Sequence, residues 1–142
     1  MAEFEFLEHT ADVKFRAFGK TMQECFSNSA RALTDTLVDV RTVEPKLNIQ
    51  VRLDSENYEK LLHRFLEEVL FQFQVEEFLA CKAELKFGES ASGWTELEGR
   101  IVGEKVDSAR HAIKTDVKAI TWNDFSLKKT REGWESSVLI DV

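Results

Sequence analysis

One amphipathic stretch between residues 55 and 74 leaves this chain few choices of architecture. Its apolar side chains recur at intervals of three and one residues: Tyr58, Leu61, Leu62, Phe65, Leu66, Val69, Leu70 and Phe73. This spacing places them on one face of an α-helix. A helix with one apolar face needs a second layer of structure to bury it. The stretch therefore predicts a long helix that packs against another element.

A second helix is predicted over residues 21–37. Thr21 and Glu24 have the spacing of a capping box, in which a hydroxyl and a carboxylate bond the free amides of the first turn. After them, apolar residues recur at helical spacing as far as Leu37.

Much of the remaining sequence alternates apolar and polar residues, the period of a half-buried strand. Strands are expected at residues 2–7, 11–18, 47–53, 79–88, 94–103, 116–122, 124–129 and 134–141. Residues 105–114 fit a short helix or a loop equally well. Two long helices among these strands predict a single α+β domain over residues 1–142, with the helices packed on mostly antiparallel sheets.

Composition and charge argue against several classes of function. With 19 basic and 26 acidic residues, the net charge is -7, so strong autonomous binding to a phosphate backbone is not expected. The acidic, alternating start is unlike a signal peptide, and no apolar stretch reaches membrane-spanning length. A cytoplasmic location is expected. Cys25 and Cys81 fall on apolar positions and are expected in the core.

The candidate site combines the two ends of the sequence. Residues 8–12 place a histidine and Asp12 at the start of a strand, and Asp141 precedes Val142. If the first and last strands lie side by side, both aspartates and the terminal carboxylate of Val142 converge, and they repel one another without a cation. Oxygen ligands of this kind suit Ca²⁺ or Mg²⁺. Taken singly, either aspartate is also explained as a solvated strand residue.

Basic and histidine side chains complete the list of candidates. Lys118, in the expected strand 116–122, either extends into solvent or meets the carboxylates. His9 is either a ligand, or the orienter of one, or a hydrogen-bonded residue at a strand end. His63 lies off the apolar stripe of its helix and is expected to be exposed, whereas His111 has no predicted role.

Catalytic motifs are missing from the sequence. It contains no Gly-rich phosphate loop, nucleophile elbow, HExxH or CxxC motif. From the residues alone, the chain is a small domain with a candidate site for a hard cation.

These residues also carry a resemblance to the archease family over essentially the whole chain. The matching segments are Phe6–Val13, Glu24–Phe26 with Ala30, Leu61–Leu66, Gly103-Glu104 with Asp107 and Arg110-His111, Val117–Thr121, and Leu139–Val142. Two positions depart from the family pattern: Lys14 stands where glycine is expected, and Asn123 stands where histidine is expected.

The resemblance implies an accessory protein rather than an enzyme. Archeases activate the RNA ligase that joins cyclic-phosphate or 3′-phosphate ends of tRNA halves to 5′-hydroxyl ends in tRNA splicing. They promote guanylylation of the ligase's active-site histidine and allow multiple turnover. The family's metal-binding acidic residues correspond to Asp12 and Asp141, with Val142 beside them, and its functional lysine corresponds to Lys118.

Two other functions stay open at this point. One is a chaperone-like modulator of a tRNA-modifying enzyme, such as a tRNA methyltransferase, which acts by surface docking and needs no metal. The other is a weak metal-dependent phosphohydrolase, which the lack of a plausible general base makes the least favoured.

Overall fold

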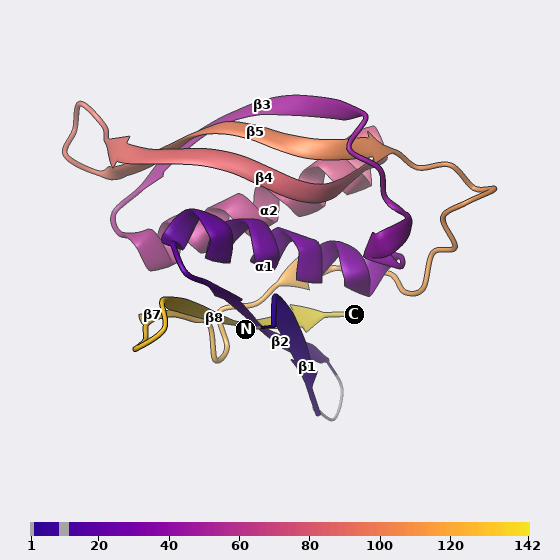
Figure 1. Cartoon of the computed structure of the whole chain (residues 1–142), viewed down its shortest axis with the longest axis horizontal. Coiled ribbons are helices and arrows are strands. Elements are labelled where there is room, and N and C mark those ends of the chain that lie inside the picture. Colours follow the sequence, from indigo (N-terminus) through magenta and orange to yellow (C-terminus); the bar gives the residue numbers. More distant parts are fainter. Residues whose placement is uncertain (1, 9–11) are drawn as a thin grey trace.

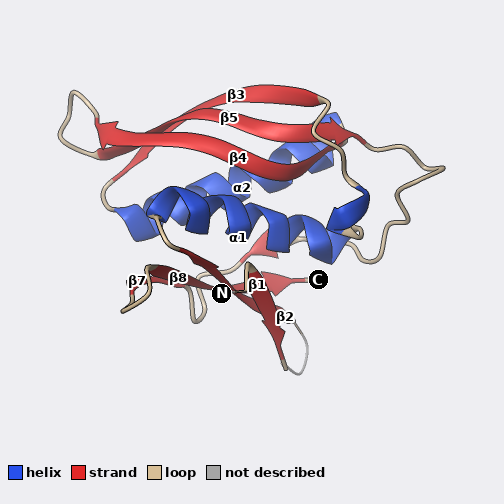
Figure 2. Cartoon of the chain, viewed as in Figure 1, coloured by secondary structure: helices blue, strands red, loops and turns tan. Residues whose placement is uncertain are grey.

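Both helices lie in a layer between two antiparallel β-sheets, as the computed structural model of the chain shows (Figure 1; Figure 2). The structure describes residues 2–8 and 12–142. The helices are α1 (Met22–Leu37) and α2 (Tyr58–Glu76), with a short 3₁₀ helix, η1, at Val40–Thr42. The α+β prediction, with helices packed on antiparallel sheets, is confirmed.

The three-stranded sheet covers one side of the helix layer. Its order is β3 (Leu47–Ser55), β5 (Thr95–Lys105) and β4 (Phe78–Glu89). β5 therefore has a partner on both sides, whereas β3 and β4 are edge strands. Apolar side chains of this sheet and of both helices share one core, which contains Phe26, Phe65 and Ile101.

The second sheet lies on the opposite side of the helices. Its strands are β1 (Phe4–Leu7), β2 (Val13–Gly19), β8 (Trp134–Asp141), β6 (Ala119–Ile120) and β7 (Ser126–Lys129). The order is β1-β2-β8-β6, and β7 also pairs with β8. The expectation that the first and last strands lie side by side is therefore wrong, because β2 lies between β1 and β8. The second strand is the one that pairs with the last.

The helix ends follow local chemistry. Thr21 caps α1, and its hydroxyl accepts a hydrogen bond from the amide of Glu24 at 3.1 Å. α2 begins three residues later than expected because β3 continues to Ser55, which pairs with Thr95 of β5. Asn57 then caps α2 by accepting a hydrogen bond from the amide of Lys60.

A position between two sheets buries more of α1 than one apolar stripe. Asn28 and Ser29 are buried as well, and both are hydrogen-bonded. Asn28 donates to the carbonyl of Phe18 at 2.7 Å, and the hydroxyls of Ser29 and Ser136 lie 2.8 Å apart. These small polar groups fasten α1 to β2 and β8. Cys25, on the same helix, is fully buried as expected, and burial raises the pKa of its thiol to about 11.

Two expectations about residues 105–122 are settled by the structure. Residues 106–118 form a loop with a turn rather than a helix, and the expected strand 116–122 contracts to β6. This segment crosses α2, where Gln74 donates to the carbonyl of Val117 and His63 bonds the carbonyl of Ile120. One side of its backbone therefore bonds helix side chains instead of another strand.

Neither helix in the described part of the chain is long and apolar enough to span a bilayer.

Candidate functional site

The two aspartates of the candidate site lie at one end of the β2–β8 pair. Val13 pairs with Ile140, so Asp12 comes directly before the first residue of β2 and Asp141 ends β8. The same register continued by one residue sets Asp12 opposite Asp141, on the sheet face away from the helices. Both residues are partly exposed. The pairing of β2 and β8 thus brings the two ends of the sequence together.

Lys118 belongs to the same end of the sheet. Its backbone N–H donates to the carbonyl of Asp141 at 2.8 Å, and the next residue, Ala119, pairs with Asp141 in the ladder. Lys118 is exposed. Asp141 thus has β2 on one side and the Lys118 segment on the other.

The remaining predicted residues are placed less completely. His9 lies outside the described residues. Val142 is half-buried and packs against the core. Among the described residues, the side chains of Asp12, Asp141 and Lys118 form no ion pair within 4.0 Å. We call Asp12, Asp141, Val142 and Lys118 the sheet-end site.

The donor chemistry of the sheet-end site suits a hard cation. Carboxylate oxygens are ligands for Ca²⁺ or Mg²⁺. Within the described part of the chain, no cluster of three or more His, Cys, Asp or Glu side chains forms a complete metal site. Asp12 and Asp141 by themselves could therefore supply only part of a coordination sphere.

A lysine close to the aspartates pairs elsewhere. Lys14, on β2, faces the same side of the sheet as Asp12, which lies two residues before it in the chain. Its ammonium lies 3.7 Å from the carboxylate of Asp124. Lys14, at the position where the resemblance predicts glycine, is therefore paired with the loop after β6.

The expectation that His63 is exposed is wrong. Only 2% of His63 is exposed, and its ring stacks on Trp122 with centroids 3.6 Å apart and planes 4° from parallel. Because a carbonyl only accepts, Nε2 donates to Ile120, at 3.1 Å. Nδ1 lies 3.3 Å from a carboxylate oxygen of Glu67. His63 therefore fixes α2 to β6, the strand that follows Lys118.

A sequence signal for this role existed. His63 lies two helical turns before Leu70, a member of the apolar stripe, so the two residues share a helix face. An aromatic partner was also available at Trp122, the last residue of the expected strand 116–122.

His111, for which no role was predicted, is buried beside the buried carboxylate of Glu104 in a polar cluster whose other members, Asp107 and Arg110, are exposed. Its Nδ1 accepts from the amide of Asp107 at 2.9 Å, and its Nε2 lies 3.2 Å from the carboxylate of Glu104. The amide of Glu44 donates to this same oxygen, Oε2, at 2.7 Å, and Arg110 donates to the other carboxylate oxygen of Glu104. We call Glu104, Asp107, Arg110 and His111 the Glu104 cluster.

The Glu104 cluster stabilises the fold. Burial raises the pKa of Glu104, but the hydrogen bonds from Arg110 and the Glu44 amide and the nearby positive charges outweigh this and lower it to about 2. Gly103, just before it, has room for no side chain, since a Cβ would lie 1.8 Å from the carbonyl oxygen of Leu79. The cluster anchors the loop that leads to Lys118.

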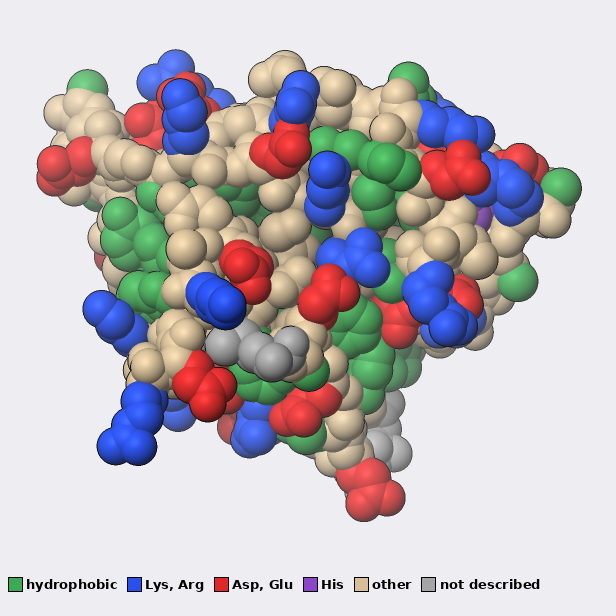
Figure 3. All heavy atoms as spheres, in the orientation of Figure 1, with side chains coloured by type: hydrophobic (Ala, Val, Ile, Leu, Met, Phe, Trp, Pro, Cys, Tyr) green, Lys and Arg blue, Asp and Glu red, His purple; other side chains and the backbone are tan. Residues whose placement is uncertain are grey.

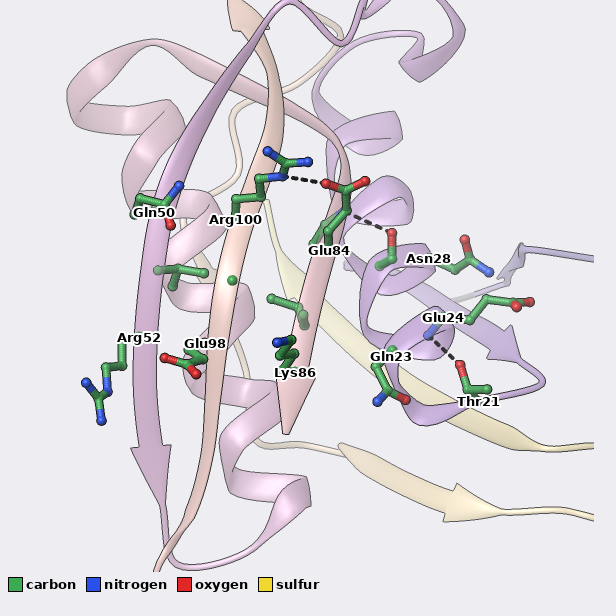
Figure 4. A pocket seen from close by; sticks show the side chains of 15 residues that line it. Thr21, Gln23, Glu24, Asn28, Gln50, Arg52, Glu84, Lys86, Glu98 and Arg100 are labelled. Atoms are coloured by element: carbon green, nitrogen blue, oxygen red, sulfur yellow. Dashed lines mark hydrogen bonds and ion pairs between the residues drawn. The ribbon is translucent and has the colours of Figure 1, made fainter. Parts of the chain in front are cut away.

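A cleft of about 1090 Å³ lies away from the sheet-end site (Figure 4). It is lined by the three-stranded sheet and by the first half of α1. Register sets its polar residues in two cross-strand rows: Gln50–Arg100–Glu84 and Arg52–Glu98–Lys86. Basic and acidic side chains are likewise interspersed over the face in Figure 3.

Known proteins resemble this chain along its whole length. The model of the archease protein family matches residues 4–142. The chain is 35% identical over 140 residues to protein archease of Methanosarcina mazei, covering 99% of this chain and 96% of that one. It is 36% identical over 143 residues to protein archease of Pyrococcus furiosus, with both chains fully covered.

Solved structures agree with these relatives. The solution structure of Methanobacterium thermoautotrophicum protein 1598 matches with a TM-score of 0.81 and 27% identity, and both chains are fully covered. A Thermotoga maritima crystal structure, described as an archease and possible chaperone, shares the fold with a TM-score of 0.56 at 14% identity, covering 96% of this chain and 94% of that one.

Proposed function

Because this chain belongs to the archease family, we propose that it is a non-catalytic activator of an RNA ligase. The ligase joins 3′-phosphate or cyclic-phosphate ends of tRNA halves to 5′-hydroxyl ends in the cytoplasm, during tRNA splicing. The activator promotes guanylylation of the ligase and multiple turnover.

One observation carries this proposal: β2, β8 and β6 meet at the end of one sheet, where Asp12, Asp141 and Lys118 all lie. We propose that Asp12, Asp141 and the carboxylate of Val142 hold a divalent ion, Ca²⁺ or Mg²⁺. When bound, the ion supplies positive charge that stabilises phosphoryl transfer. Partial exposure of both aspartates leaves their oxygens accessible to a ligase docked at this end.

Lys118 has a separate role in the proposal. Its backbone bond to Asp141 fixes the position of the residue, while its side chain is exposed. The ammonium either holds the carboxylates or contacts a phosphate of the ligase's nucleotide. A change of Lys118 to Met separates these roles, because only the first predicts a changed metal affinity.

The test is a ligase guanylylation and turnover assay at low divalent metal, with and without this protein. Asp12→Asn and Asp141→Asn are expected to reduce activation to the level of the ligase alone. Asp54→Asn is the matched control, since Asp54 lies on β3 in the other sheet. It is expected to activate like the parent chain.

Full activation by both sheet-end variants would contradict the proposal. If substitutions of the exposed acidic residues of α2, such as Glu59 and Glu67, then abolished the effect on a partner, the result would favour a chaperone-like modulator of a tRNA-modifying enzyme. Hydrolysis of a phosphate ester by the isolated protein would instead indicate an enzyme.

A further inference from the structure

The free edge of β4 is only partly covered. β4 has β5 on one side alone. On its other side, the amide of Ala83 donates to the hydroxyl of Ser27 at 2.9 Å, and Arg31 donates to the carbonyl of Cys81 at 2.7 Å. Side chains of α1 thus replace a neighbouring strand along this part of β4.

Farther along β4, this cover ends. Because a strand alternates, the N–H and C=O groups of Leu85 and Phe87 point to the same side as those of Ala83. One helical turn before Ser27, Gln23 lies at the level of Leu85, because one turn and two strand residues are of similar length. No hydrogen bond joins α1 to Leu85 or Phe87 among the described residues, and both Leu85 and Gln23 line the cleft. Figure 4 shows the cleft between the start of α1, with Gln23, and the part of β4 that carries Lys86.

Backbone groups spaced in this way fit an extended chain. An exposed edge strand presents alternating donors and acceptors, and a peptide that adds as a further strand satisfies them. The cleft, at about 1090 Å³, has the volume of a ligand-binding site. The free edge continues to Glu89, where β4 ends.

Charge in the cleft favours a basic segment over a second copy of this acidic chain. Four of the charges in or beside the cleft neutralise each other in two cross-strand ion pairs, Arg100–Glu84 and Arg52–Glu96. Glu24 and Glu98 form no ion pair in the described part of the chain, and Lys86 alone opposes them among the cleft's remaining charges. With a net charge of -7, two copies also repel each other.

We propose that the edge of β4 from Leu85 to Glu89 binds an extended, basic segment of a partner protein as an added strand, between β4 and the start of α1. The inference goes beyond the proposed function and does not rest on the sheet-end site. It assigns the cleft to protein docking, with affinity from backbone hydrogen bonds and selectivity from Glu24 and Glu98.

Amide hydrogen exchange by NMR tests the proposal. In the free protein, the amides of Leu85 and Phe87 are expected to exchange fast and that of Lys86, which bonds β5, slowly. The probe is an acetylated heptapeptide that alternates Lys and Val. At saturation it is expected to slow exchange at Leu85 and Phe87 by about tenfold. The same peptide with Glu for Lys is expected to have little effect.

Two matched substitutions locate the peptide. Gln23→Trp fills the cleft at the level of Leu85 and is expected to weaken peptide binding about fivefold. Gln72→Trp makes the same change on α2, outside the cleft, where the Gln72 amide bonds only Glu68 of its own helix. It is expected to bind the peptide normally.

Three outcomes would overturn the proposal. One is slow exchange at Leu85 in the dilute free protein, which means that the edge already has a partner. Another is protection that grows with protein concentration alone, which assigns the edge to a second copy. The last is unchanged exchange at Leu85 and Phe87 with about 1 mM peptide. Loss of ligase activation in Asp141→Asn leaves this test unaffected.

Discussion

The sheet-end site and the Glu104 cluster contain similar residue types but differ in how their carboxylates are bonded. Each combines carboxylates with a basic side chain. In the cluster, the buried Glu104 accepts hydrogen bonds from Arg110 and the amide of Glu44. At the sheet end, Asp12, Asp141 and Lys118 are partly or fully exposed, and their side chains form no ion pair among the described residues. A carboxylate satisfied from within stabilises the fold, whereas one left unsatisfied is available to an external ligand.

The largest effect on stability is expected at the cluster. Glu104→Ala leaves Arg110 and His111 without their shared partner and is expected to lower the free energy of unfolding by about 3 kcal/mol. Urea denaturation measures this loss. Asp141→Asn serves as the comparison and is expected to change stability by less than about 0.5 kcal/mol. Equal losses in both variants would remove the distinction between the two regions.

The pH dependence of that loss sharpens the comparison. Glu104 has a lowered pKa of about 2 in the folded chain, so its stabilising contribution is complete above its ordinary pKa of 4.5 and is lost as the pH falls toward 2. The stability difference between the parent chain and Glu104→Ala is therefore expected to be constant from pH 7 to about pH 5. Urea midpoints at lower pH should then converge. A difference that stays constant down to pH 3 would refute this account.

Metal affinity probes the other region. Asp141→Asn removes one anionic ligand and is expected to weaken Ca²⁺ or Mg²⁺ binding by about tenfold or more, about 1.4 kcal/mol. Isothermal titration calorimetry measures it, and Asp107→Asn, a change within the cluster, is the control. Weaker binding in the control alone would assign the metal to the cluster.

The smallest effect is expected from the terminal carboxylate. A short Gly-Ser extension after Val142 moves this group away and is expected to weaken metal binding about threefold, because two side-chain carboxylates remain. Unchanged affinity would reduce the proposed ligand set to Asp12 and Asp141.

Periodicity predicted most of the fold because most elements bury one face. The expected helix 21–37 and strands 11–18 and 134–141 correspond to α1, β2 and β8 with end shifts of at most two residues. Alternation does not specify which strands are neighbours, so the order β1-β2-β8 could not be derived. The contraction of 116–122 to β6 depends on contacts with α2, which local pattern does not record.

The candidate site was predictable to a different extent. Asp12, Asp141 and Lys118 were identified as residues, and the structure places them at one sheet end. The bond of Glu104 to the amide of Glu44 joins segments far apart in sequence, so spacing gave no sign of it. The exposure of His63 was predicted wrongly because only the apolar face of the helix was expected to be buried. A helix that lies between two sheets is buried over a wider part of its surface, and His63 lies in that part.

The position of β8 has a consequence for how the protein is made. β2, β6 and β7 all pair with β8, yet all of them precede it in the chain. Val13, for example, cannot pair until Ile140 has been synthesised. The pairing of β2 with β8 closes a very long loop. During synthesis, the sheet therefore lacks its central strand, β8, until residues 134–141 have left the ribosome. In the nascent chain only the β1–β2 pair could cover this side of the helix layer, and Asp12 would remain without its counterpart until translation of β8 is complete.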